Sequence, residues 1–405
     1  MVPMKPSILF IVPEHYDALK LKGTDKMIFE RDEYGFFHKV ITIHPLCYKT
    51  RSIEFNHCHK LYEIGLDLIP GSERWRFLMY LQSPGHFFRV VWNIVKLVKK
   101  YRISLIRTTD PFWMGLFGYL AARICRIHFC VSIHADHDHI RELGNKARMV
   151  TVLGSFGMAK RLMRFILSKA DMVIPIRETL AIKAIQNGAD PEKVRIIPHG
   201  IDLSPFNLPP VHYISDRLGI DPAKKIISFA GRLSPENYVD DMLVIARKLG
   251  EKRQDFMIVM AGGGKDEERL KNKIAGDSSL AKHILLVGFQ PRDVCLDLRR
   301  ASTVSLCLMA GFSLIEACAA GRPVISYDVA WHSELVKSNE TGFLLKEHDI
   351  DAVVEALDWL LEHPSESDAM GERAKTMAFE RHDLKNTSAI KVRAYSELLK
   401  QGEGH

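Results

Sequence analysis

One stretch of the chain, residues 303–335, limits the possible fold more than any other. It contains two short apolar runs, Val304–Leu308 and Val324–Tyr327. Between them, Gly311 precedes an alanine-rich segment, Ser313–Ala320. This order predicts a strand, a glycine turn, a helix and a second strand. Because a strand that returns through a helix to another strand is the unit of a parallel sheet, we predict an α/β protein.

The start of the predicted helix is a candidate binding site. Its first backbone N–H groups have no partner within the helix, and the helix dipole places partial positive charge there. A phosphate is the usual ligand of such a helix start when a strand and a glycine turn lead into it. Glu316, one turn further on, could then face a ribose. The alternative is a capping box, in which Ser313 and Glu316 hydrogen-bond to each other's backbone N–H groups.

Several segments of the chain together resemble the retaining glycosyltransferases of family 4. The segment GFSLIEACAAGRPVI at residues 311–325 resembles the donor-binding segment of that family. The other matching segments occur in the family's order: IIPHGIDLSPF at 196–206, ISFAGRLSPEN at 227–237, MIVMAGGGKDEERL at 257–270 and GFLL at 342–345. The resemblance implies the GT-B fold, an α/β architecture of two Rossmann-like domains facing a central cleft.

The length and the resemblance together predict the domain organisation. The 405 residues are enough for two domains with separate cores. We expect residues 1–204 to form an acceptor-side domain and residues 205–383 to bind the donor. A helix within residues 384–405 resembles the terminal helix that packs back onto the first domain in this family. Residues 205–216 contain three prolines and are expected to form the linker.

The composition indicates a cytoplasmic protein. No apolar run is long enough to cross a bilayer, and the N-terminal residues have no cleavable signal pattern. The seven cysteines include no C-x-x-C pair, so we expect reduced thiols and no disulfide framework.

The positive charge of the chain is concentrated in one region. Residues 71–170 hold 17 Lys and Arg against 5 Asp and Glu, which indicates an anionic partner. Two basic segments there, residues 86–101 and 158–169, are predicted to form amphipathic helices that could lie on an anionic membrane surface. The alternative is ordinary surface helices packed on the sheet. Neither segment has a nucleic-acid-binding motif, so we expect no nucleic-acid partner.

The resemblance also implies roles for individual residues. The family's arginine after the first strand of the donor domain contacts the donor pyrophosphate, and here that residue is Arg232. The planar guanidinium suits a phosphate because it donates paired, charged hydrogen bonds. His134 corresponds to a histidine that faces the donor sugar, so the expected catalytic residues are His134, Arg232 and Glu316. The expected donor-binding residues are Gly231, Arg232, Gly263, Gly311, Phe312, Ser313, Leu314 and Glu316.

The chain departs from the family pattern at two positions. Asn237 stands where the family has a lysine, and Leu308 stands where it has a second glutamate. Lys265, which follows three glycines, is a candidate substitute for the missing cation. These departures leave the donor sugar open and motivate one alternative, a nucleotide-binding scaffold that has lost its transfer activity.

The acceptor side is less well marked in the sequence. Gly23 lies where the family carries a glycine-rich loop, and Asp136 is a candidate acceptor contact. The histidines and aspartates of residues 134–139 could instead bind a metal in a hydrolase, and residues 57–59 read His-Cys-His. We favour the sugar-facing role for His134 and a solvent-facing loop at residues 57–59, and we predict no metal site and no cofactor.

The predicted activity is transfer of a sugar from a nucleoside-diphosphate sugar to an acceptor hydroxyl, with retention. No catalytic nucleophile is evident, which fits a site that supplies position and electrostatics. The basic region favours an acceptor in glycolipid, lipopolysaccharide or exopolysaccharide assembly, and a protein peripheral to the cytoplasmic membrane. A nucleotide-sugar epimerase of the same fold is the other alternative, because it would share the nucleotide site without needing an acceptor.

Overall fold

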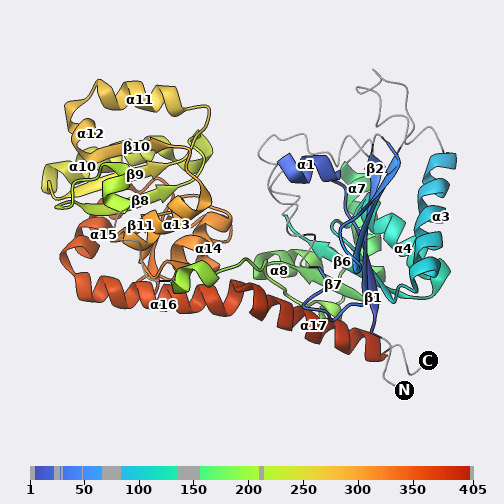
Figure 1. Cartoon of the computed structure of the whole chain (residues 1–405). Helices are drawn as coiled ribbons and strands as arrows, with labels where there is room; N and C mark the ends of the chain where they lie inside the picture. Colours follow the sequence, from blue (N-terminus) through green and yellow to red (C-terminus); the bar gives the residue numbers. More distant parts are fainter. Residues whose placement is uncertain are drawn as a thin grey trace. The chain divides into compact units, whose positions relative to one another are not determined.

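The computed structural model describes residues 5–21, 28, 31–47, 49–65, 84–135, 156–208 and 214–401. The chain forms two compact units, each containing one sheet (Figure 1). The first unit comprises residues 1–199 and 387–405, and the second comprises residues 200–386. The segment that we expected to link two domains therefore lies within the second unit. Its residue Phe206 is buried in a core cluster there, together with Leu203 and Leu314.

The first unit is built on a seven-stranded sheet of order β3-β4-β2-β1-β5-β6-β7. All neighbouring strands are parallel except β3 and β4. The strand order reverses between β1 and β5, which pair directly. The strands are β1 Ser7–Ile11, β2 Lys39–Cys47, β3 Arg51–Glu54, β4 His59–Gly65, β5 Leu105–Thr108, β6 His128–Ile133 and β7 Met172–Pro175. The helices are α1 Tyr16–Leu21, α3 Pro84–Tyr101, α4 Trp113–Cys125, α7 Phe156–Lys169, α8 Glu178–Gln186 and α17 Leu384–Gln401, with a short 3-10 helix η3 at Pro191–Lys193.

Both faces of the first sheet are covered by helices. One core cluster joins the sheet to α3, α4, α7 and α8. A second cluster joins residues such as Ile8 and Phe10 to Tyr395 of α17, the last helix of the described chain. Because both faces are buried, the central strands are apolar at nearly every position rather than at alternate ones.

The second unit is built on a six-stranded, wholly parallel sheet of order β10-β9-β8-β11-β12-β13. Its strand order reverses between β8 and β11. The strands are β8 Lys225–Ala230, β9 Phe256–Ala261, β10 Ile284–Gly288, β11 Val304–Leu306, β12 Val324–Tyr327 and β13 Gly342–Leu345. The helices are α9 Ile214–Leu218, α10 Val239–Lys252, α11 Glu267–Ala275, α12 Ser278–His283, α13 Arg292–Ala301, α14 Phe312–Ala319, α15 Ile350–Glu362 and α16 Pro364–His382, with 3-10 helices η4 Ser204–Asn207, η5 Pro235–Asn237 and η6 His332–Glu334.

Two features of the first unit do not follow from local sequence patterns. Residues 194–198 are a largely apolar run, VRIIP, that forms an extended segment with a single bridge to β7. Arg195 and Ile197 donate backbone hydrogen bonds to β7, so the segment continues the sheet edge without forming a full ladder. The pair β3 and β4 lies in a region without a clear hydrophobic pattern. Among the described residues, no helix is long and apolar enough to cross a membrane.

Candidate functional site

The candidate donor site lies where the strand order of the second sheet reverses. Ligands of open α/β sheets bind beyond the carboxyl ends of the strands at such a reversal, because the connecting helices there leave the sheet on opposite faces. The strands at the reversal are β8, which ends at Ala230, and β11, which ends at Leu306. The loops that follow them carry Arg232 and Gly311, two of the residues predicted from the sequence.

Glycines bring the loops after β8 and β9 into direct backbone contact. Gly262 has φ of +154°, and a Cβ there would lie 1.8 Å from the carbonyl oxygen of Gly231. Only glycine fits this position, since a side chain would overlap the neighbouring backbone. Leu233 N donates to the carbonyl oxygen of Gly263 over 3.0 Å. Gly231 and Gly263 thus belong to one pair of interlocked loops beside the strand-order reversal.

Arg232 is exposed at the end of the β8 loop. The position of the family's lysine is held by Asn237, whose side-chain amide donates to the carbonyl oxygen of Arg232 over 2.6 Å. Lys265, the candidate substitute cation, pairs with Glu236 at 3.3 Å on the surface. Asn237 therefore orders the backbone of the arginine loop, and Lys265 has an acidic partner of its own.

Helix α14 begins without a side-chain cap. Its N-cap residue is Gly311, and no side chain accepts a capping hydrogen bond there. Among the described residues, apart from the two chain neighbours of Gly311, no atom lies within 4 Å of the place that a Cβ would take there, so this side of the helix start is open. Ser313 Oγ instead donates to the carbonyl oxygen of Ala230, at the end of β8, over 2.6 Å. The capping-box alternative is wrong, and Ser313 ties the start of α14 to the neighbouring strand.

Two arginines of α13 hold Glu316. Arg292 Nε lies 2.9 Å from one carboxylate oxygen, and Arg299 Nη1 lies 2.9 Å from the other. The Arg299 side chain is only 4% exposed, so its charge requires this partner. Arg299 Nη2 also donates to Ser313 Oγ over 2.5 Å and to the Ala230 carbonyl oxygen over 3.2 Å. A charged network thus joins α13, α14 and β8 beneath the candidate site.

These arginines and His332 were not predicted from the sequence. The His332 ring is fully buried, with Nδ1 2.5 Å from Ser326 Oγ and Nε2 3.0 Å from the carbonyl oxygen of Ala310. It therefore supports the loop that leads into α14. Leu308, in the same loop, is fully buried in the core, so the place of the family's second glutamate is filled by packing. The sequence carries no local signal for His332, because its role depends on contacts made across the sheet.

In the first unit, His134 directly follows β6 and lies against a second histidine. The rings of His134 and His199 stack with centroids 5.1 Å apart, and His134 Nδ1 lies 3.4 Å from His199 Nε2. Asp110 follows the neighbouring strand β5, and its carboxylate accepts from Phe112 N over 2.8 Å. Burial raises the pKa of the Asp110 carboxyl to about 6. Two titratable side chains thus follow adjacent strands at the carboxyl edge of the first sheet, and Asp110 was not predicted.

Several sequence-based candidates lie outside the described residues. They include Gly23, Asp136 and the remaining histidines of the possible metal hydrolase site, His137 and His139. At residues 57–59, the backbone N–H groups of Cys58 and His59 both donate to Asn56 Oδ1. This turn leads into β4, and His59 is buried rather than solvent-facing.

Both units match known protein families. Residues 50–205 match the family described as Glycosyltransferase Family 4, and residues 213–377 match the family described as Glycosyl transferases group 1. A D-inositol 3-phosphate glycosyltransferase of Gordonia bronchialis is 28% identical over 247 residues, which cover 58% of this chain and 54% of the relative. An alpha-monoglucosyldiacylglycerol synthase of Streptococcus pneumoniae is 26% identical over 281 residues, covering 67% and 62%. The matches thus span between half and two thirds of these relatives.

Comparison with solved structures supports the fold. The crystal structure of Anabaena HepE in complex with UDP matches 96% of this chain and all of its own chain, with a TM-score of 0.69 and 16% identity. The neighbours are two-domain proteins with the GT-B fold, as expected from the sequence.

Proposed function

The chain belongs to the glycosyltransferases of family 4, and from this membership we propose that it transfers a sugar from a nucleoside-diphosphate sugar to an acceptor hydroxyl with retention of the anomeric configuration. One observation carries the proposal. Arg232 and the open start of α14 follow adjacent strands at the strand-order reversal of the second sheet, where such folds bind their ligands.

The donor diphosphate is assigned to Arg232 and to the backbone amides of residues 311–314. An arginine and a helix start can together neutralise the two phosphates, so this role needs no metal ion. Glu316 is assigned to the ribose hydroxyls. Its two arginine partners fix the orientation of the carboxylate, and each oxygen can accept a further hydrogen bond.

The reaction would depend on positioning and electrostatics rather than on a covalent intermediate. Charge develops on the leaving diphosphate as the bond to the sugar breaks, and cationic groups fixed in advance stabilise that charge. The diphosphate can then accept the proton of the acceptor hydroxyl on the same face of the sugar. His134, after β6 of the first unit, is assigned to orienting the sugar or the acceptor. An anomeric assignment of the product by NMR tests retention.

A thermal-shift screen against UDP, GDP, ADP, dTDP and CMP tests the donor site. A nucleotide that binds only the folded protein raises the melting temperature as its concentration exceeds its Kd. We expect a shift for one diphosphate, and we expect EDTA to leave that nucleotide-induced difference unchanged. Arg232→Ala should reduce the affinity about tenfold to a hundredfold, because a charged hydrogen bond contributes about 1.5–3 kcal/mol.

The matched control is Arg247→Ala. Arg247 is an exposed arginine of α10 in the same unit, and it pairs with Asp277 rather than with a residue of the β8 loop. The control should leave nucleotide affinity unchanged. An unchanged affinity in Arg232→Ala would refute the phosphate assignment. Nucleotide binding without any transfer or hydrolysis of a nucleotide sugar would favour the inactive scaffold.

The acceptor side is proposed to approach an anionic membrane surface. On α3, Phe88 and Trp92 are 68% and 58% exposed, although the opposite face of that helix is buried. Lys96 lies 5.9 Å from the centre of the Trp92 ring, so aromatic and cationic groups share one face. Exposed apolar rings beside lysines are typical of helices that rest on anionic lipid. A lipid-linked or polysaccharide acceptor fits this surface, and one relative is named for a product built on diacylglycerol.

A further inference from the structure

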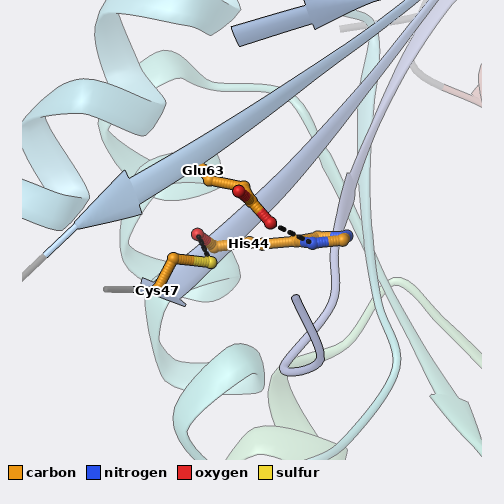
Figure 2. Close-up of side chains that lie close together, drawn as sticks. All are labelled: His44, Cys47 and Glu63. Atoms are coloured by element: carbon orange, nitrogen blue, oxygen red, sulfur yellow. Dashed lines mark hydrogen bonds and ion pairs between the residues drawn. The ribbon is translucent and has the colours of Figure 1, made fainter. Parts of the chain in front are cut away.

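Three side chains with metal-binding atoms lie together in the first unit, apart from the residues assigned to the donor. They are His44 and Cys47 near the end of β2, and Glu63 near the end of β4. Figure 2 shows the Glu63 carboxylate turned toward the His44 ring, with Cys47 beside them. All three residues are buried, with exposed fractions of 0%, 3% and 3%. Among the described residues, this is the group whose ligand atoms lie close enough to hold one ion.

An irregularity in β2 brings the histidine and the cysteine together. In a regular strand, residues three apart point to opposite faces of the sheet. Here His44 pairs with Glu63 and Cys47 with Gly65, so three steps along β2 oppose two along β4. The extra residue is a β-bulge, which restores His44 and Cys47 to one side. Pro45 lies inside the bulge, where the missing N–H of proline removes no ladder hydrogen bond.

The donor atoms have the spacing that a small cation requires. They all lie within 4.8 Å of one another, and His44 Nδ1 is 3.7 Å from Glu63 Oε1. Metal bonds of about 2.0–2.3 Å at tetrahedral angles place neighbouring ligand atoms about 3.3–3.8 Å apart. The His44–Glu63 distance already falls in this range, and the distances to the sulfur exceed it by at most about 1 Å.

The histidine ring lacks the hydrogen-bond partners that a buried ring normally has. Among the described residues, none forms a hydrogen bond with His44 Nδ1 or Nε2, although the residue is fully buried and Nδ1 lies 3.7 Å from Glu63 Oε1. Leaving a buried polar atom unpaired destabilises the folded protein. A cation bound to one ring nitrogen would remove that destabilisation.

The carboxylate has the outer partners that a ligand carboxylate needs. Glu63 Oε2 accepts from Arg51, and Oε1 accepts from the backbone N–H of Tyr16 over 2.8 Å. Ligating carboxylates are usually fixed by such second hydrogen bonds. Arg51 also pairs with Asp17 at 2.7 Å, so its position is fixed in turn.

We propose that His44, Cys47 and Glu63 bind one divalent cation of the zinc class. A thiolate, an imidazole nitrogen and a carboxylate oxygen are the ligands of Zn²⁺, whereas Mg²⁺ and Ca²⁺ take oxygen ligands. The Cys47 thiol gives up its proton to solvent on binding, and the thiolate and carboxylate together balance the dipositive ion. The ion ties β2 to β4, and through Tyr16 it fixes the start of α1.

Cobalt substitution tests the site, because Co²⁺ bound by a thiolate has a charge-transfer absorption that Zn²⁺ lacks. Metal-free protein titrated with Co²⁺ should develop this absorption up to one equivalent and lose it when Zn²⁺ is added. Cys47→Ser should abolish the charge-transfer band. Cys58→Ser, which changes a cysteine outside the group, should leave it intact. Arg51→Gln should keep the band and weaken the affinity about 10- to 100-fold, as loss of an outer partner does.

A band retained in Cys47→Ser, or the absence of a band in the unaltered protein, would overturn the proposal. Circular dichroism of each variant checks that it folds. If Cys47→Ser does not fold, X-ray absorption at the zinc edge of the unaltered, zinc-loaded protein decides the question. One sulfur and two or three nitrogen or oxygen neighbours would support the site, and a shell without sulfur would refute it. Nucleotide binding plays no part in these measurements, so their outcome is independent of the proposed transfer activity.

Discussion

At the scale of single residues, Glu316 illustrates how a local pattern can have three meanings. The sequence left open whether it belonged to a capping box or faced a ribose. The structure excludes the capping box and adds ion pairs to Arg292 and Arg299. Because one partner is almost fully buried, Glu316 contributes to stability whatever it binds. A test of its ribose role must therefore be independent of stability.

Glu316→Gln should remove the preference of the protein for nucleotides that carry the ribose hydroxyls. We compare the nucleoside diphosphate found in the screen with its 2′,3′-dideoxy form. The unaltered protein should prefer the ribose form by about tenfold to a hundredfold, because a hydrogen bond to a charged group contributes about 1.5–3 kcal/mol. The variant should lose most of this preference, as measured by calorimetric titration. An equal preference in both proteins would remove Glu316 from the ribose site, even if the variant melted at a lower temperature.

Asp110 gives a prediction for pH dependence. An unfolded aspartate has a pKa of about 3.9, and burial raises the pKa of Asp110 to about 6 in the fold. The folded protein therefore holds this proton more tightly, and the group's contribution to stability falls as pH rises between these values. Asp110→Asn keeps an acceptor for Phe112 N but has no charge. At about pH 7.5 it should be more stable than the unaltered protein, on the order of 1 kcal/mol after screening of a partly exposed group.

Urea unfolding of both proteins near pH 7.5 and near pH 4.5 measures this difference. The advantage of Asp110→Asn should shrink at the lower pH, where the aspartate is largely protonated in the folded state. A difference that is the same at both pH values would mean that the carboxyl is ionised throughout.

At the scale of elements, strands and helices were predictable where glycine or proline residues mark their ends. Strand β12 has the predicted bounds because Pro323 precedes it and its four residues are apolar or buried. The pair β3 and β4 was not predictable, because β3 is an exposed edge strand with no apolar alternation. The glycine loops of the candidate site follow strands and could be read from the sequence. The roles of Arg299 and His332 could not be predicted, because both residues contact loops that are distant in the sequence and come near them only in the folded sheet.

The exposed face of α3 carries its own prediction. Lys96→Glu, Lys99→Glu and Lys100→Glu together should abolish flotation with vesicles that contain anionic lipid, because each lysine near such a surface contributes about 1 kcal/mol. The matched control reverses three exposed lysines of the second unit, Lys282, Lys337 and Lys346. Flotation of the control should equal that of the unaltered protein. Flotation that survives the reversal on α3 would place the lipid contact elsewhere, and absence of flotation in the unaltered protein would exclude it.

At the scale of the whole molecule, the two units are connected twice. The chain enters the second unit after residue 199 and returns to the first after residue 386. The returning helix α17 contributes Tyr395, which is fully buried against the strands of the first sheet. Its hydroxyl accepts from Arg107, and Lys391 on the same helix pairs with Glu33 at 3.0 Å. The first unit therefore depends on residues from both ends of the described chain.

Tyr395→Ala should destabilise the first unit selectively. Removing a large buried side chain costs about 3–5 kcal/mol, whereas Tyr395→Phe keeps the packing and should cost about 1–2 kcal/mol. Hydrogen exchange read by mass spectrometry separates the units, and faster exchange should be confined to peptides of β1, β5 and β6. Equal acceleration in β8 and β9 would mean that the two units unfold together.

The late position of α17 in the chain has a consequence for synthesis. A ribosome adds about 5–20 residues per second, so roughly 20 to 80 s separate the synthesis of Phe10 from that of Tyr395. During that interval one face of the first sheet lacks the helix that covers it, while residues 200–386 are being added. All strands of the second unit are synthesised before α17 can cover the sheet of the first unit. The part of the protein that is made first is therefore the part that is finished last.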